Sequence, residues 1–209
     1  MTITEITEDS VIHKLGDMVA EANPLSKPLF MSSGVPRSSG LHLSQIIQDL
    51  YYGDKPEEET PDYTRMCVGF AWEILLADAL GRVFHQADLC DAGILLHPGE
   101  YERDGILMSP DATYLYDNVL EEYKATWTNS KKPIAEHPAW ICQTKSYCYV
   151  LGMDTVRFRV LHIMGDYKGG GPIIKTWLVT YTQEEMERNW FVVKQHAIEK
   201  GWLQPKGGA

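Results

Sequence analysis

The chain has 209 residues, a length that suits one domain with a sizeable hydrophobic core. Hydrophobic residues make up 44% of it and charged residues 23%, a composition typical of globular proteins that excludes wholesale disorder. The net charge of −10 argues against a protein whose whole surface binds nucleic acid, but it leaves room for a local basic groove. No apolar run approaches the roughly 18 residues of a membrane helix, and the acidic start lacks a signal-peptide pattern. We therefore expect a soluble, cytoplasmic protein without a membrane partner.

The first 60 residues predict accessory structure rather than a strong core element. A short helix is expected near 11–21, and a loop rich in Pro, Ser and Gly follows over 23–40. Ser44 has the side chain of an N-cap, and the short amphipathic helix after it has Ile46 on its apolar side.

Residues 64–80 give the first strong helical pattern, because apolar side chains recur at helical spacing and Gly81 can end the helix. Glu73 falls near the apolar face of this helix. A carboxylate in that position is costly unless it is paired, hydrogen-bonded or bound to a metal, although such a residue more often reaches solvent from the rim of the face.

The hydrophobic period between residues 93 and 127 changes from that of helices to that of strands. The expected strands cover 93–96, 105–111, 112–116 and 119–126. A second strong helix over 139–151 is followed by strands over 156–164 and 173–182 and by a last helix over 184–200. This order predicts an α/β fold with a central mixed β-sheet flanked by α-helices, without an interdomain linker.

The four cysteines form neither a Cys-x-x-Cys pair nor a Cys/His zinc spacing. Cys67 and Cys142 fall in apolar helical stretches, where a free thiol is usually a small buried hydrophobe. An iron–sulfur cluster would need all four cysteines, so the spacing disfavours such a cluster without excluding it.

The most informative stretch is an SPD sequence that ends at Asp111, followed by an EYK sequence that ends at Lys124. Alternate residues of a strand point to the same face, so Glu122 and Lys124 project together, while Glu121, the competing carboxylate, faces away. Pro110 cannot donate to a strand ladder, which places Asp111 at a strand end. Two carboxylates can hold a divalent cation, and an ammonium beside them can orient or deprotonate a water. An ordinary exposed strand has the same pattern.

A second constellation lies on the helix expected over 139–151, where Gln143 and Tyr147 are four residues apart and share a face. In chain order the sequence contains GFAWE ending at Glu73, GILMSPD, EYK and then QTKSY. These four motifs resemble those of the PD-(D/E)xK nucleases, and the RecB-like and lambda-exonuclease-like branch is the most similar. The resemblance covers about 69–152 and implies a restriction-endonuclease-like core.

The resemblance implies a role for each residue of the site. Asp111 and Glu122 would ligate Mg²⁺ or Mn²⁺, as one ion or two, with the carbonyl of Tyr123 as a further ligand. Glu73 would help to hold the metal. Lys124 would position and polarise the attacking water, and the two carboxylates beside it would normally hold it protonated, so the general base stays unassigned.

The remaining implied residues concern the substrate. Gln143 would orient the site or the scissile phosphate, and Tyr147 would support its helix or contact DNA. Lys131 and Lys132, in the polar loop before that helix, are candidates for substrate binding. Arg37 is a further candidate, since its loop can meet a terminal phosphate.

The leading hypothesis is a single nuclease domain that hydrolyses DNA with a divalent metal, as an exonuclease in recombination or repair, encoded by a phage or its host. Its expected parts are an accessory segment 1–60, a nuclease core 64–182, a C-terminal helix 183–203 and a flexible tail 204–209. DNA is the implied partner, and a homo-oligomer or a recombination partner protein stays open. The alternatives are a non-catalytic module of this fold that binds DNA or a protein, or a structural protein with accidental motif matches.

Overall fold

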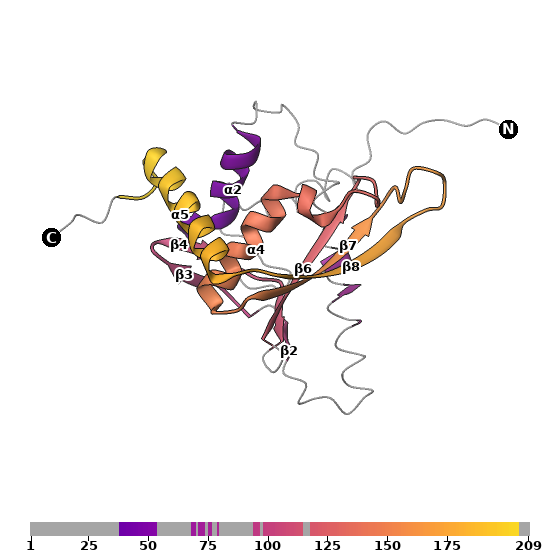
Figure 1. The fold of residues 1–209 in the computed structure, drawn as a ribbon, viewed down its shortest axis with the longest axis horizontal. Coiled ribbons are helices and arrows are strands. Elements are labelled where there is room, and N and C mark those ends of the chain that lie inside the picture. The colour runs from indigo at the N-terminus through magenta and orange to yellow at the C-terminus, as the bar shows by residue number, and fades with distance from the viewer. Residues whose placement is uncertain are drawn as a thin grey trace, which may run out of the picture.

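The protein was analysed as a computed structural model, which describes residues 38–53, 68–69, 71–73, 75–76, 79, 94–96, 98–114 and 118–204. Their arrangement confirms the predicted α/β fold class, with a mixed sheet and helices packed against it (Figure 1). The helix expected near 11–21, the candidate Arg37 and most of the expected tail lie outside the described residues. No helix within the described ranges combines the length and the apolar character needed to cross a membrane.

A five-stranded sheet of order β2-β5-β6-β7-β8 forms the centre of the described fold. Its strands are β2 (Ile94–Leu96), β5 (Ala112–Tyr114), β6 (Val119–Thr126), β7 (Thr155–His162) and β8 (Ile173–Thr180). β6 and β7 run parallel, and the other neighbours run antiparallel. A parallel pair needs a crossover connection, which helix α4 (Pro138–Leu151) supplies after a short 3-10 turn, η1 (Ile134–Glu136).

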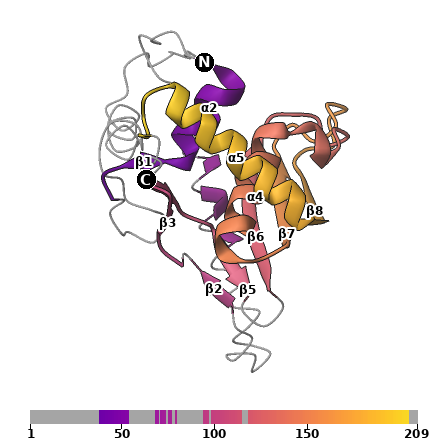
Figure 2. The same ribbon diagram turned by 60° about the vertical axis from the view of Figure 1, so that its left-hand side comes forward.

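Three helices cover one face of this sheet. α2 (Leu43–Tyr52), α4 and α5 (Gln183–Glu199) pack against one another, as Figure 2 shows. Phe158 and Val160 of β7 and Trp190 and Val193 of α5 lie in the core between the layers. Because alternate residues of β6 and β7 face this core, Glu122 and Lys124 point toward the helices together with Leu120.

The opposite face of the sheet has a smaller apolar cluster of Trp72, Ala112 and Tyr123. The described positions between 68 and 79 are helical, in agreement with the helix predicted over 64–80. Trp72 Nε1 also donates a hydrogen bond to the carbonyl of Arg159, at 3.3 Å. The segment that contains Glu73 is therefore fixed to the sheet by the residue just before it.

The strand predicted over 105–111 is shorter in the structure. It is β4 (Ile106–Met108), which pairs with β3 (Tyr101–Arg103) and with β1 (Leu41–His42) in a small separate sheet. The turn between β3 and β4 has Asp104 at φ 55° and Gly105 at φ 82°, as a tight hairpin requires. The strand stops before Pro110, which has no N–H to donate, and this break leaves Asp111 in a bend immediately before β5.

Candidate active site

A cavity of about 310 Å³ lies between the start of α2, the helical segment around Glu73, strand β6 and helix α4. The predicted site residues that line it are Glu73, Asp111, Glu122, Tyr123, Lys124, Gln143 and Tyr147. The fold thus brings side chains from all four sequence motifs to one place. Lys131 and Lys132 do not line this cavity; they lie in the loop after β6.

The Glu122 and Lys124 pair forms the wall of the cavity that β6 provides. Lys124 Nζ lies 2.5 Å from Glu122 Oε1, and the Glu122 side chain is 1% exposed. Burial raises the pKa of Glu122, although Lys124 opposes the effect. Burial alone would lower the pKa of Lys124, but the charges of Glu122 and Asp111 raise it above its usual value. Lys124 is therefore an ammonium group in this site, suited to orient a ligand rather than to accept a proton.

Asp111 reaches the cavity from the bend that precedes β5. Its Oδ2 accepts a hydrogen bond of 2.7 Å from the backbone N–H of Tyr123, which holds the carboxylate against β6. Burial raises the pKa of Asp111 well above its usual value, and the nearby charges of Glu122 and Glu73 raise it further. The fold therefore crowds carboxyl groups into one cavity and disfavours the charged form of Asp111.

Helix α4 contributes a chain of hydrogen bonds that ends on Lys124. Lys124 Nζ donates to Gln143 Oε1 at 3.0 Å, and Gln143 Nε2 donates to the hydroxyl of Tyr147 at 2.8 Å. That hydroxyl donates in turn to the carbonyl of Ser109, at 3.3 Å. Gln143 and Tyr147 are one helical turn apart, so α4 presents both to the cavity. The chain fixes the orientation of the Gln143 amide and, through it, the position of the ammonium group.

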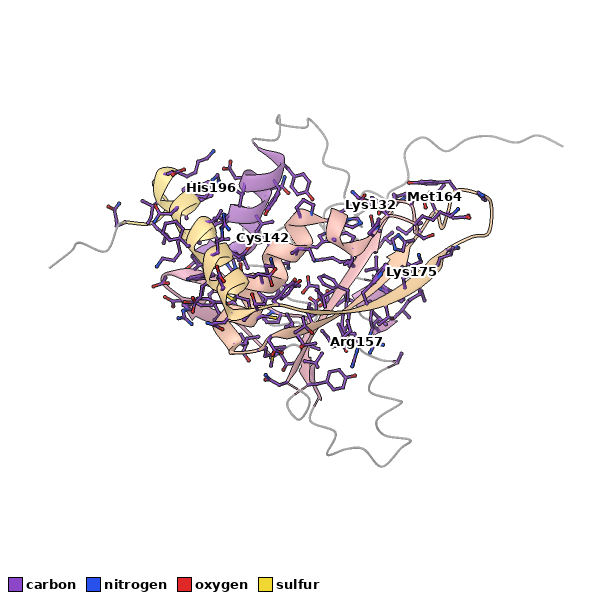
Figure 3. All side chains as sticks on the ribbon, in the orientation of Figure 1. Lys132, Cys142, Arg157, Met164, Lys175 and His196 are labelled. Atoms are coloured by element: carbon purple, nitrogen blue, oxygen red, sulfur yellow. The ribbon has the colours of Figure 1, made fainter. Side chains whose placement is uncertain are left out.

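Glu121 lies on the other face of β6 and takes no part in the cavity. Its buried carboxylate accepts hydrogen bonds from Arg157 Nη1 at 2.9 Å and from Arg159 Nε at 2.8 Å. Figure 3 shows Arg157 on the side of the sheet away from Cys142 of α4. This geometry favours Glu122 over Glu121 as the candidate ligand. Cys142 and Cys148 of α4 are free and buried, and the other two cysteines lie outside the described residues.

Three polar residues that the sequence did not single out as site residues also line the cavity, namely His42, Ser44 and Ser109. The expectation that Ser44 caps the short helix was wrong, because α2 begins one residue earlier with His42 as its N-cap. The backbone N–H of His42 donates to Gln45 Oε1 at 2.9 Å, which satisfies a donor at the helix start. In the sequence, the only sign that His42, Ser44 and Ser109 could belong to the site is that their side chains are polar.

The donor set of the cavity fits a divalent cation. No three His, Cys, Asp or Glu side chains form a ready-made metal cluster within the described ranges. However, Glu122 Oε2 is buried and has no hydrogen-bond partner among the described residues, and such an orphaned oxygen is costly without a counter-charge. Carboxylate oxygens of Asp111, Glu122 and Glu73 are the ligands that Mg²⁺ and Mn²⁺ prefer. Lys124 now supplies part of the charge that a cation would provide.

Asp111 before β5, Glu122 and Lys124 on β6, and Gln143 and Tyr147 on α4 thus form one site within a mixed α/β fold. The structure is similar to the crystal structure of SSO0001, with a TM-score of 0.51 and 12% identity over 98% of this chain and 91% of that one. It also matches a phage-related exonuclease from Haemophilus somnus 129PT, with a TM-score of 0.39 and 11% identity over 78% of this chain and 95% of that one. A third match is an alkaline exonuclease from Laribacter hongkongensis, with a TM-score of 0.41 and 15% identity over 77% of this chain and 87% of that one.

The match to SSO0001 is a likeness of fold, in agreement with the α/β fold class predicted from the sequence. No model of a protein family matches the sequence, and no curated protein matches it. At identities of 11 to 15% the likeness concerns the fold alone, so the activity has to be argued from the site.

Proposed function

We propose that this protein is a metal-dependent deoxyribonuclease that hydrolyses the phosphodiester bonds of DNA. The observation that supports it is the meeting of Glu73, Asp111, Glu122 and Lys124 in one cavity, since these residues come from motifs scattered along the sequence. The resemblance to lambda-exonuclease-like enzymes extends the proposal to exonuclease action on DNA ends, in recombination or repair.

The residues of the cavity would have different roles in the reaction. The carboxylates of Asp111, Glu122 and Glu73 would hold Mg²⁺ or Mn²⁺, whose charge offsets that of the phosphodiester, acidifies a bound water and stabilises the leaving 3′ oxygen. Lys124 donates hydrogen bonds toward the reacting phosphate or water, where its positive charge stabilises the charge that develops. Gln143 keeps Lys124 in place through the 3.0 Å bond, so it acts as a positioning residue.

Cleavage of linear and covalently closed circular duplex DNA, with Mg²⁺, Mn²⁺ or EDTA, tests the proposal. We expect wild-type protein to degrade the linear form in a metal-dependent way and to leave the circle intact. Lys124→Ala and Asp111→Asn should each lower the rate by about 100-fold or more, as loss of a preorganised charged group does in other enzymes. Lys145→Ala is the matched control, because Lys145 lies on α4 but pairs with Glu185 at 3.5 Å outside the cavity. Full cleavage by both site variants rejects the assignment.

A non-catalytic module with the same fold is the second candidate. The net charge of −10 favours it, as does the contact of 2.5 Å between Lys124 and Glu122, which already neutralises one candidate ligand. Isothermal titration with Mn²⁺ separates the two functions. A nuclease binds the ion, and Asp111→Asn or Glu122→Gln weakens that binding, whereas the module binds no ion and cleaves neither form of DNA.

A further inference from the structure

A second hollow, of about 450 Å³, adjoins the catalytic cavity at the end of β6. Its lining consists of Ala125, Thr126, Trp127, Thr128 and Tyr167. Ala125 of β6 lines both the cavity described above and this hollow. Tyr167 belongs to the connection between β7 and β8, which projects from the end of the sheet in Figure 1. We call this hollow the side groove.

Tyr167 presents an aromatic ring to the side groove in a fixed orientation. Its hydroxyl donates a hydrogen bond to the backbone carbonyl of Trp127, while the residue as a whole is 56% exposed. Tyr167 also has φ 63°, a left-handed conformation that glycine adopts freely and tyrosine does not. Gly165 and Gly169, in the same connection, have positive φ values too. A large exposed ring thus occupies a position where the backbone favours glycine.

Lysines lie in the two loops that contribute to the side groove, although the protein as a whole is acidic. Lys131 and Lys168 are exposed and Lys132 is half-buried, and none of the three pairs with a carboxylate of the described residues. Figure 3 shows Lys132 and Lys175 at the end of the sheet where β7 turns into β8. Two acidic residues, Glu136 and Asp166, lie in the same loops. Asp166 Oδ1 accepts the backbone N–H of Lys168, at 3.0 Å, so that carboxylate shapes the turn.

We propose that the side groove binds an unpaired DNA strand next to the catalytic cavity, with a base stacked on Tyr167 and phosphates contacting Lys131, Lys132 and Lys168. The inference rests on the proposed nuclease function of the cavity. Exposed lysines match the charge of the phosphate backbone. An exposed aromatic ring matches the face of an unstacked base, whereas a duplex keeps the faces of its bases stacked within it. A single strand therefore fits the groove better than a duplex does.

Fluorescence anisotropy with the full chain in EDTA tests the inference without cleavage. The probes are a labelled oligothymidylate of about 20 nucleotides and a duplex of the same length, which exceed the ~4–16 nucleotides of a typical single-strand site. Tyr167→Gly keeps the backbone conformation but removes the ring, and it should weaken binding of the single strand by about 5- to 150-fold, the range for loss of one stacked base. Tyr167→Phe keeps the ring and should bind as the wild type does. Tyr167→Asn is a second variant without the ring, since asparagine also tolerates a left-handed conformation.

Substitution of the lysines should change the salt dependence of binding. Lys131→Ala and Lys168→Ala should each lower the slope of log K against log salt concentration by about 0.7 for the single strand. Arg188→Ala is the matched control, because Arg188 is exposed on α5, away from the β7–β8 connection. Thermal unfolding of each variant verifies that it is folded.

Two results would overturn the inference: wild-type protein that binds duplex more tightly than the single strand, or Tyr167→Gly and Tyr167→Asn that bind as the wild type does. If the wild type cleaves DNA in either case, the nuclease proposal stands without the side groove. If no preparation cleaves DNA but loss of the ring weakens binding, the nuclease proposal fails and the groove still binds a single strand.

Discussion

Glu121 and Glu122 are neighbours on β6, but substituting each by glutamine should change a different property. Glu121 is fully buried and contacts Arg157 at 2.9 Å and Arg159 at 2.8 and 3.2 Å. Glu122 faces the cavity, where one oxygen lies 2.5 Å from Lys124. Both substitutions keep the shape of the side chain and remove one negative charge, so the difference between them depends on the face of the strand.

Glutamine at position 121 leaves two guanidinium groups without their counter-charge and turns an NH₂ group toward one of them. Removing one partner of a buried ion pair costs about 3–5 kcal/mol. The Arg157 and Arg159 side chains are 26% and 23% exposed, so water can partly replace the carboxylate and we expect about 3 kcal/mol, at the lower end of that range. For a domain of this size the melting temperature should then fall by about 6–12 °C.

Glutamine at position 122 should lower DNA cleavage without lowering the stability of the fold. Burial disfavours the charged form of Glu122 and raises its pKa, so removing the charge should leave the melting temperature unchanged or raise it. DNA cleavage should fall by about 100-fold or more, because a candidate metal ligand is lost. Urea and thermal unfolding measure the stability of the two variants. Their activity is measured as Mg²⁺-dependent cleavage of linear DNA, well below both melting temperatures. Wild-type stability of Glu121→Gln together with full activity of Glu122→Gln would refute the assignment of the two faces.

Three further outcomes are expected. Tyr147→Phe removes the acceptor of Gln143 Nε2, so the kcat of DNA cleavage should fall by about 10-fold while the KM stays unchanged; steady-state kinetics measure both. Mn²⁺ at about 100 times its Kd should stabilise the wild type by about 2.7 kcal/mol and Asp111→Asn by much less, as urea unfolding will show. Burial, with the charges of Lys132 and His162, lowers the pKa of His137 to about 4, whereas an unfolded histidine titrates near 6.5. The unfolded state therefore binds the proton first, and the free energy of unfolding should fall by up to about 3 kcal/mol as the pH drops from 6.5 to 4; His137→Gln should flatten this dependence.

Strong local patterns made the central elements predictable. The pattern over 119–126 predicts β6 (Val119–Thr126) to the residue, because Val119, Tyr123 and Thr126 favour a strand and a turn precedes it. The pattern over 139–151 likewise predicts α4 (Pro138–Leu151), which starts one residue earlier and is followed by Gly152 in the left-handed conformation. β1 and β3 were not predicted, since strands of two and three residues have no measurable period and form through pairing with β4.

Motif order predicted which residues meet in the cavity, while their catalytic roles stay a prediction. Strand alternation also predicted that Glu121 faces away from Glu122, but not what Glu121 contacts. Its partners Arg157 and Arg159 lie 36 and 38 residues later, and they reach it through the parallel register of β6 and β7. The place of His42 in the cavity depends on how α2 packs against α4, which local sequence does not encode.

The acidity of the protein and its proposed action on DNA are compatible because of how charge is distributed in the cavity. With all three carboxylates ionised, the cavity would have a formal charge of −2, which repels a phosphodiester, and burial of Asp111 and Glu122 opposes that ionisation. A divalent cation would offset that charge and favour the ionised carboxylates, which is the electrostatic basis of the metal dependence that we propose. The lysines of the side groove lie outside this balance, where they can attract the DNA backbone without neutralising the carboxylates that a metal needs.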